Sequence, residues 1–258
     1  MQDADPRIAH HYDELAALWD DIVADPSRER LLWETLDGML PDLDGKHVLD
    51  AGCGSGFYAE RYVDRGADVT GVDLSEDMLD RARQQVPDAE FVQADLGESL
   101  DFLDDDSVDV VVCQHVFSHL PDLSGPLSEF ARVLVDGGVL VVSTHNPVHD
   151  YVVVREGEYP TETMPGDMEA TVETESATPV YDETERYDII WNSGPDSNRA
   201  TYYRRSIEGL FSPVLDAGFE IRDVVEPTPD EAFTRENPEI AAGFKQDAAK
   251  SVCLKAVR

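Results

Sequence analysis

The sequence contains only four lysines and three cysteines among its 258 residues, and it has no long apolar run. Cys53, Cys113 and Cys253 are odd in number and widely spaced, so they predict neither a disulfide framework nor a metal-binding pair. No stretch reaches the ~18 to 20 consecutive apolar residues that a membrane helix needs. The first residues, MQDADPRIAHHYDE, have neither the basic start nor the apolar run of a signal peptide. We therefore expect a cytoplasmic protein that holds no metal and binds no membrane.

Basic side chains are scarce as well, with 20 against 55 acidic ones and a net charge of -35. Without a basic stripe to neutralise phosphates, nucleic acid is not expected as a partner. Repulsion among so many carboxylates destabilises a compact fold in dilute buffer, whereas at 1 M salt the Debye length is only ~3 Å and the charges are screened. Because the acidic residues are spread through the chain, we interpret the composition as that of a halophilic protein. A mesophilic acidic protein is the alternative.

The chain is long enough for one large α/β domain with an insertion. After two helical patterns at 7–20 and 27–40, strands and helices alternate, which is typical of βαβ crossovers and a mostly parallel sheet with helices on both faces. The predicted strands are 47–51, 68–72, 90–93, 108–113 and 138–143, and the predicted helices between them are 57–65, 76–85 and 123–134.

Residues 147–205 interrupt this alternation with a polar segment rich in Thr, Glu and Pro that carries short β-like pieces, YVVV and YDII. The segment is too long for an ordinary connection, so it is either a lid over a binding site or a partly disordered insertion, and we favour the lid. The chain therefore divides into four parts. They are an N-terminal helical cap (1–44), a core (45–146), the insertion (147–205) and a return to the core sheet (206–258).

The segment VLDAGCGSG, residues 48–56, places glycine at every second position where a buried strand ends. Glycine permits positive φ and lets a ligand approach the backbone, and ligands of open parallel sheets bind beyond the carboxyl ends of the strands. The pattern departs from the dinucleotide fingerprint G-x-G-x-x-G, because Phe57 stands where its last glycine would fall. A nucleotide-like ligand without a pyrophosphate contact is expected. A sharp strand-to-helix turn without a ligand is the alternative.

Acidic residues end the next two strands. Asp73 lies 21 positions after Gly52, where a carboxylate can accept both hydroxyls of an adenosine ribose. Asp95, followed by Leu96, ends the third strand and could accept a hydrogen bond from the adenine amino group. Any one of these acids, or Asp50 of the first strand, could be a surface residue in so acidic a chain. Together with the glycines they predict an adenosyl ligand.

Several segments between about Gly45 and Pro147 resemble, in register, the class I S-adenosylmethionine-dependent methyltransferases. They are VLDAGCGSG, GVDLSEDMLDRAR, FVQADL, VVVCQHVFSHLPD and GGVLVVSTHNP. The similarity is greatest to the small-molecule subgroup, of methyltransferase type 11/25, and resumes at YYRRSIEGLFSPVLDAGFEIRDVVEPTP. It implies a Rossmann-like sheet of seven strands with the last one antiparallel, S-adenosylmethionine as cofactor and a small-molecule methyl acceptor.

The resemblance also implies roles for single residues. The expected cofactor contacts lie at the methionyl part (Asp50, Gly52, Cys53, Gly54, Gly56, Gln114 and His115), the ribose (Asp73) and the adenine (Leu74, Met78, Asp95 and Leu96), with Tyr12 over the cofactor. Tyr202 and Tyr203 are expected on the substrate side. Core packing is the alternative for these tyrosines.

Methyl transfer requires an acceptor in line with the S–CH3 bond, and such positioning can lower the barrier by ~7 to 11 kcal/mol. A hydroxyl or protonated amine acceptor also benefits from a base, for which His115 and His119 are the candidates. For His119, capping of the turn before Pro121 is the alternative. Three functions stay open: a methyltransferase, an NAD(P)-dependent oxidoreductase, and a non-catalytic S-adenosylmethionine-binding sensor. A monomer and a homodimer are both compatible with the sequence.

Overall fold

The computed structural model describes residues 28–159, 169–174, 178–192, 197–244 and 249–258. The helix predicted at 7–20 and the predicted cofactor contact Tyr12 lie outside these ranges. The described chain begins with a π-helical turn, η1 (Arg28–Trp33), which continues into α2 (Glu34–Met39). The helix predicted over 27–40 is therefore present from Arg28 on, with a wider first turn than an α-helix.

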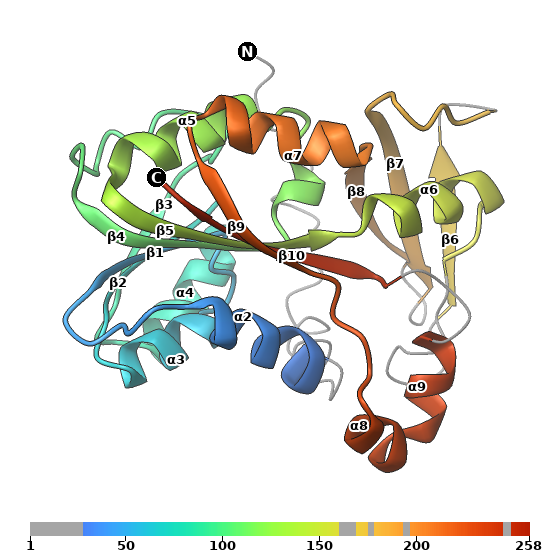
Figure 1. Cartoon of the computed structure of the whole chain (residues 1–258), viewed down its shortest axis with the longest axis horizontal. Helices are drawn as coiled ribbons and strands as arrows, with labels where there is room; N and C mark the ends of the chain where they lie inside the picture. Colours follow the sequence, from blue (N-terminus) through green and yellow to red (C-terminus); the bar gives the residue numbers. More distant parts are fainter. Residues whose placement is uncertain (1–27, 160–168, 175–177, 193–196, 245–248) are drawn as a thin grey trace.

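Seven strands form the main sheet in the order β3-β2-β1-β4-β5-β10-β9 (Figure 1). Their bounds are β1 (His47–Ala51), β2 (Asp68–Asp73), β3 (Glu90–Gln93), β4 (Val108–Gln114), β5 (Leu134–His145), β9 (Glu220–Val225) and β10 (Ser251–Val257). Neighbouring strands from β3 to β5 pair in parallel, and β10 is antiparallel to both β5 and β9. The predicted Rossmann-like sheet with an antiparallel last strand is confirmed.

Helices cover both faces of this sheet (Figure 1). On one face lie α2, α3 (Phe57–Asp64) and α4 (Glu76–Gln85), and on the other α5 (Ser124–Val133) and α7 (Ile207–Asp216). Strand β4 shows why the strands are apolar on both sides. Val110 and Val112 pack in the cluster between the sheet and helices α2 and α3. Val111 and Cys113 pack in the cluster between the sheet and helices α5 and α7.

Strand β5 begins four residues before the predicted start at 138. Leu134 pairs with Val108, after which the register shifts and Val139 pairs with Val110. Between these pairs stands Gly137 with a φ of 77°, which an ordinary residue rarely adopts. The paired glycines at 137–138 therefore resemble a strand boundary in the sequence, although in the fold they form an irregularity within the strand.

The described part of the insertion contains α6 (Pro147–Glu156) and a three-stranded antiparallel sheet, β6 (Glu169–Thr174), β7 (Glu185–Asn192) and β8 (Ser197–Arg204). The β-like piece YDII lies in β7, as predicted. The prediction for YVVV is wrong, because residues 151–154 are helical. Asn146 accepts a hydrogen bond from Val148 N (2.9 Å), Pro147 opens the helix and Gly157 ends it at φ 73°, so the capping signals override the β-propensity of the valines.

Two short helices between β9 and β10, α8 (Glu231–Glu236) and α9 (Pro238–Phe244), were not expected from the sequence. Asp230 accepts a hydrogen bond from Phe233 N (2.6 Å) at the start of α8, and Phe233 packs against Leu31 of η1 and Ala241 of α9. In the part of the chain that the structure describes, every helix is too short or too polar to span a lipid bilayer.

Candidate functional site

The glycine loop follows β1 at the carboxyl edge of the sheet. Gly52, Gly54 and Gly56 have φ values of 82°, 53° and 85°, so all three use the positive-φ backbone that glycine permits. A Cβ atom added at Gly52 would lie 2.2 Å from Cγ2 of Val116, whereas one added at Gly54 would meet no atom within 4 Å. The loop is therefore packed tightly against the core at Gly52 and open at Gly54.

Asp73 connects this loop to the end of β2. Its Oδ2 accepts a hydrogen bond from Gly54 N and its Oδ1 accepts one from Ser75 N, both at 2.9 Å. Ser75 in turn caps α4 by accepting a bond from Met78 N (3.2 Å). An ionised carboxylate has about four lone-pair sites, so bonding the loop is compatible with accepting ribose hydroxyls at Asp73.

Asp50 lies beside the loop and is only 2% exposed. Burial, with a smaller contribution from the charge of Asp73, raises the pKa of its carboxyl to about 7. Among the described residues its Oδ2 has no hydrogen-bond partner, nor has Oε1 of Gln114, whose Nε2 donates to the Tyr62 hydroxyl (2.7 Å). Two buried acceptors without donors fit a ligand that brings N–H groups, such as the ammonium of a methionyl moiety.

The predicted adenine side follows β2 and β3. Met78 and Leu96 are buried, while Leu74 and Asp95 are half-buried. The two strand ends are adjacent, because Ala94 N donates to Asp73 O (3.1 Å). In the glycine loop, burial raises the pKa of the Cys53 thiol well above its usual value, so this thiol stays protonated and packs as an apolar group.

The two histidines proposed as bases lie at different depths. His115 follows β4 with a φ of 56°, unusual for a non-glycine residue, and its backbone N donates to Ser143 O (2.8 Å). His119, in the 3-10 turn η2 (Phe117–His119), is buried, with Nδ1 at 2.8 Å from Thr201 O of β8. Burial lowers the pKa of His119 to about 4, which makes it a weak base near neutral pH. The hydrogen bond between His119 and Thr201 joins the core to the insertion.

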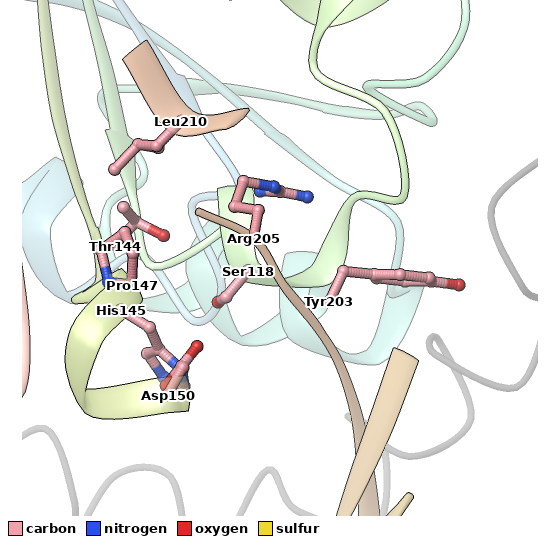
Figure 2. Close-up of a pocket in the computed structure, with 8 residues that line it drawn as sticks. All are labelled: Ser118, Thr144, His145, Pro147, Asp150, Tyr203, Arg205 and Leu210. Atoms are coloured by element: carbon pink, nitrogen blue, oxygen red, sulfur yellow. The ribbon is translucent and has the colours of Figure 1, made fainter. Parts of the chain in front are cut away.

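Figure 2 shows a small pocket where the end of β5 meets α6 and the chain that follows β8. It is lined by Ser118, Thr144, His145, Pro147, Asp150, Tyr203, Arg205 and Leu210. Tyr203 therefore borders a cavity. Tyr202 is buried, with its ring centroid 5.0 Å from that of His145 and 4.6 Å from that of His119.

Sequence reasoning did not include His145 and Asp150. The available signal was the segment STHNP, which places a histidine directly after the predicted strand 138–143, at the edge where ligands bind. Among the described residues, no group of three or more His, Cys, Asp and Glu side chains is arranged to hold a metal ion.

Comparison with known proteins identifies the family of this fold and site. A family model described as "Methyltransferase domain" matches residues 49–142. A ubiquinone biosynthesis O-methyltransferase of Leptothrix cholodnii is 30% identical over 181 residues, which cover 64% of this chain and 74% of that protein. The chain belongs to the class I S-adenosylmethionine-dependent methyltransferase family.

Other methyltransferases agree with this assignment. A ubiquinone biosynthesis O-methyltransferase of Paracidovorax citrulli is 34% identical over 153 residues, 55% of this chain, and the match spans 63% of that relative, less than two thirds of its length. The crystal structure of an S-adenosylmethionine-dependent methyltransferase from Mesorhizobium loti superposes with a TM-score of 0.66 at 23% identity, covering 88% of this chain and 97% of that one. At this identity the superposition supports the methyltransferase fold.

Proposed function

We propose that this chain transfers the methyl group of S-adenosylmethionine to a small-molecule acceptor. The observation that carries the proposal is the hydrogen bond from Gly54 N to Asp73 Oδ2 (2.9 Å). It joins the open point of the glycine loop to the carboxylate that would bind the ribose. An adenosyl ligand held there would extend along the loop toward the unpaired acceptors of Asp50 and Gln114.

The residues that would hold the cofactor divide by chemistry. Asp73 would accept the ribose hydroxyls, Met78 and Leu96 would supply apolar surface for the adenine, and Asp50 with Gln114 would accept from the ammonium group. When bound, S-adenosylmethionine supplies an electrophilic methyl group on a positively charged sulfonium. A cation beside Asp50 favours the ionised form of its carboxyl group, so Asp50 would become a better acceptor on binding.

We propose that residues 147–205 form the acceptor side of the site and act as a lid over it. Tyr203 and Arg205 line the pocket of Figure 2 from this segment. The relatives named as O-methyltransferases support a small acceptor with a reactive oxygen. The net charge of -35 supports a cytoplasm of high salt as the working environment and argues against nucleic acid as a partner.

An oxidoreductase is less consistent with the site, because Phe57 begins α3 where a dinucleotide site would place a glycine. The alternative is a sensor that binds S-adenosylmethionine without turnover, and an assay for methyl transfer tests it. In molar KCl, methyl-tritiated S-adenosylmethionine and a small-metabolite extract should give at least one labelled product above a control without protein. A chain that binds the cofactor and labels nothing would be a sensor.

A further inference from the structure

His145 and Asp150 form a buried histidine–carboxylate pair that the assignment of cofactor contacts leaves unused. His145 is the last residue of β5, and Asp150 lies in the first turn of α6. Nδ1 of His145 is 3.2 Å from Oδ1 of Asp150, with the two side chains 15% and 5% exposed. Figure 2 shows the imidazole ring beside the carboxylate at the wall of the pocket.

The charge of Asp150 determines which ring nitrogen carries hydrogen. Burial opposes ionisation, but the neighbouring His145 and His149 hold the pKa of Asp150 well below its usual range. Nδ1 of His145 and Oδ1 of Asp150 are in ion-pair range without hydrogen-bond geometry, and the negative charge beside Nδ1 favours the tautomer in which Nδ1 carries the hydrogen and Nε2 keeps a lone pair. Among the described residues none forms a hydrogen bond with this Nε2, whereas Nδ1 also lies 3.4 Å from the Tyr187 hydroxyl.

The ring lies next to the proposed methionyl side. The centroids of the His145 and His115 rings are 5.8 Å apart, and His115 N is bonded to Ser143 O of the strand that carries His145. Val116, which follows His115, is the residue that a Cβ at Gly52 would strike. A short series of contacts therefore connects the glycine loop to His145.

We propose that His145, oriented by Asp150, is the general base that deprotonates a hydroxyl acceptor during methyl transfer. This rests on the proposed function above. The acceptor oxygen forms a bond to the methyl carbon while the C–S bond breaks, and its electron pair returns to sulfur, leaving the neutral thioether S-adenosylhomocysteine. The hydroxyl proton moves to Nε2 of His145, and the resulting imidazolium is stabilised by the charge of Asp150.

Other charged and titratable groups face this ring from the surrounding elements: His115 after β4, His119 in η2, His149 in α6, Tyr187 in β7, Tyr202 in β8 and Arg205 after β8. Burial lowers the pKa of Arg205 to about 10, so it stays cationic near neutral pH and partly offsets Asp150. Burial and then the charge of Asp150 raise the pKa of Tyr187, so its hydroxyl stays protonated. Burial lowers the pKa of His119 to about 4, so His119 is a weak base near neutral pH.

His149 offers a matched control. It lies on the same helix as Asp150, is buried, and has Nδ1 3.7 Å from the same Oδ1, yet it is not a wall of the pocket. The variants His145→Gln and His149→Gln therefore remove one histidine each from around Asp150. Only the first removes the proposed base.

Ring nitrogen NMR of the full chain tests the pair without any turnover. With 15N-labelled histidine near neutral pH, His145 should show the Nδ1–H tautomer, and Asp150→Asn should lower the population of that tautomer while His149→Gln leaves it unchanged. Addition of S-adenosylhomocysteine, whose binding is followed by calorimetry, tests the cofactor site separately. An Nε2–H tautomer for His145 would overturn the pair even if the cofactor product binds. Absence of binding would overturn the proposed function instead.

Turnover gives the second readout, with methyl-tritiated S-adenosylmethionine and a panel of catechols and phenols of graded acidity. His145→Gln should lower kcat by ~10²- to 10⁴-fold and abolish the fall in rate that the wild type shows as the pH is lowered, with S-adenosylhomocysteine affinity retained. His149→Gln should keep that fall. Equal kcat in wild type and His145→Gln would overturn the role of His145. No transfer to any hydroxyl acceptor by a wild type that binds the cofactor product would overturn the acceptor class.

Discussion

Asp73 is the side chain on which the cofactor site most depends, because it bonds the glycine loop and the start of α4 with its two oxygens. A single carboxylate thus fixes the loop before any ligand arrives. Such preorganisation lowers the ordering cost of binding. The glycines around it differ in role, since one is packed against the core and another faces open space.

Alanine substitutions at these two glycines should separate packing from ligand space. Gly52→Ala brings a Cβ to 2.2 Å from Val116 Cγ2 at a φ of 82°, so it should lower the free energy of unfolding by about 2 to 4 kcal/mol. Gly54→Ala meets no atom within 4 Å and should cost only about 1 kcal/mol from its backbone conformation. Urea denaturation measures both values.

The same variants should rank in the opposite order for binding. Calorimetry at a temperature where both are folded should show a larger loss of S-adenosylhomocysteine affinity in Gly54→Ala, because its Cβ occupies the ligand side of the loop. An unchanged affinity in Gly54→Ala would place the ligand elsewhere.

Ionisation of Asp50 should make the free energy of unfolding depend on pH. Its folded-state pKa is raised to about 7, so the native state retains a proton that the unfolded chain loses near pH 4. This group therefore lowers the free energy of unfolding as the pH rises from about 4 through about 7. Asp50→Asn should remove that slope and be more stable than the wild type at pH 8 by about 1 to 4 kcal/mol.

Urea titrations at several pH values in constant KCl measure this effect as the difference between wild type and variant. Asp68→Asn removes an exposed carboxylate at the start of β2 but keeps Asp50, so this control variant should retain the wild-type slope. A wild type and an Asp50→Asn variant with parallel pH profiles would mean that Asp50 is ionised in the fold.

The insertion is attached to the core by polar contacts made at the end of β8. His119 bonds Thr201 O, and the buried guanidinium of Arg205 donates to the carbonyls of Phe117 and Leu120 around η2. Ser118 of η2 and Tyr203 of β8 both line the pocket, so these bonds connect two of the elements that form its wall. A mutation that breaks these bonds should therefore destabilise both the insertion and the turn after β4.

Arg205→Met should remove the guanidinium donor from both carbonyls, leaving Phe117 O with its bond from Leu120 N (3.3 Å). We expect the free energy of unfolding to fall by about 2 to 4 kcal/mol, as for buried hydrogen bonds to a charged group. Arg222→Met, which removes an exposed pair with Glu220, should change it by less than about 1 kcal/mol. Denaturation midpoints at constant KCl measure both, and equal losses would contradict a special role for Arg205.

Most of the core elements could be predicted from the sequence, and the reasons differ from element to element. Helix α4 matches its predicted bounds because Ser75 caps it and its apolar residues follow one face. The β-strand prediction for YVVV is wrong, because the helix start signal at Asn146–Pro147 outweighs the β-propensity of the valines. The pair of His145 and Asp150 could not be predicted, because its geometry depends on how α6 leaves β5 and how β7 and β8 pack against both.

The molecule as a whole combines an apolar interior with an acidic exterior. The net charge is -35, and most acidic side chains in the described part of the chain are exposed. Ion pairs such as those of Arg132 with Glu129 and Asp105 neutralise only a part of this charge. Screening by salt should therefore contribute to stability everywhere on the surface rather than at one site.

The melting temperature should rise steeply between low salt and molar KCl. If screening contributes about 3 kcal/mol, the rise would be roughly 6 to 12 °C for a chain of this size. A neutral osmolyte at equal osmolality is the control and should give a smaller rise, because it leaves the charges unscreened. Equal melting temperatures at low and molar KCl would contradict the halophilic interpretation.

Calorimetry of the cofactor site tests the central claim most directly. S-adenosylhomocysteine and NAD are each titrated in molar KCl into the wild type and into Asp73→Ala. We predict that S-adenosylhomocysteine binds the wild type, that NAD binding is negligible, and that Asp73→Ala weakens binding of S-adenosylhomocysteine by about 10- to 100-fold, since the ribose loses a charged acceptor. Tighter binding of NAD than of S-adenosylhomocysteine, or equal affinities of wild type and Asp73→Ala, would contradict the account.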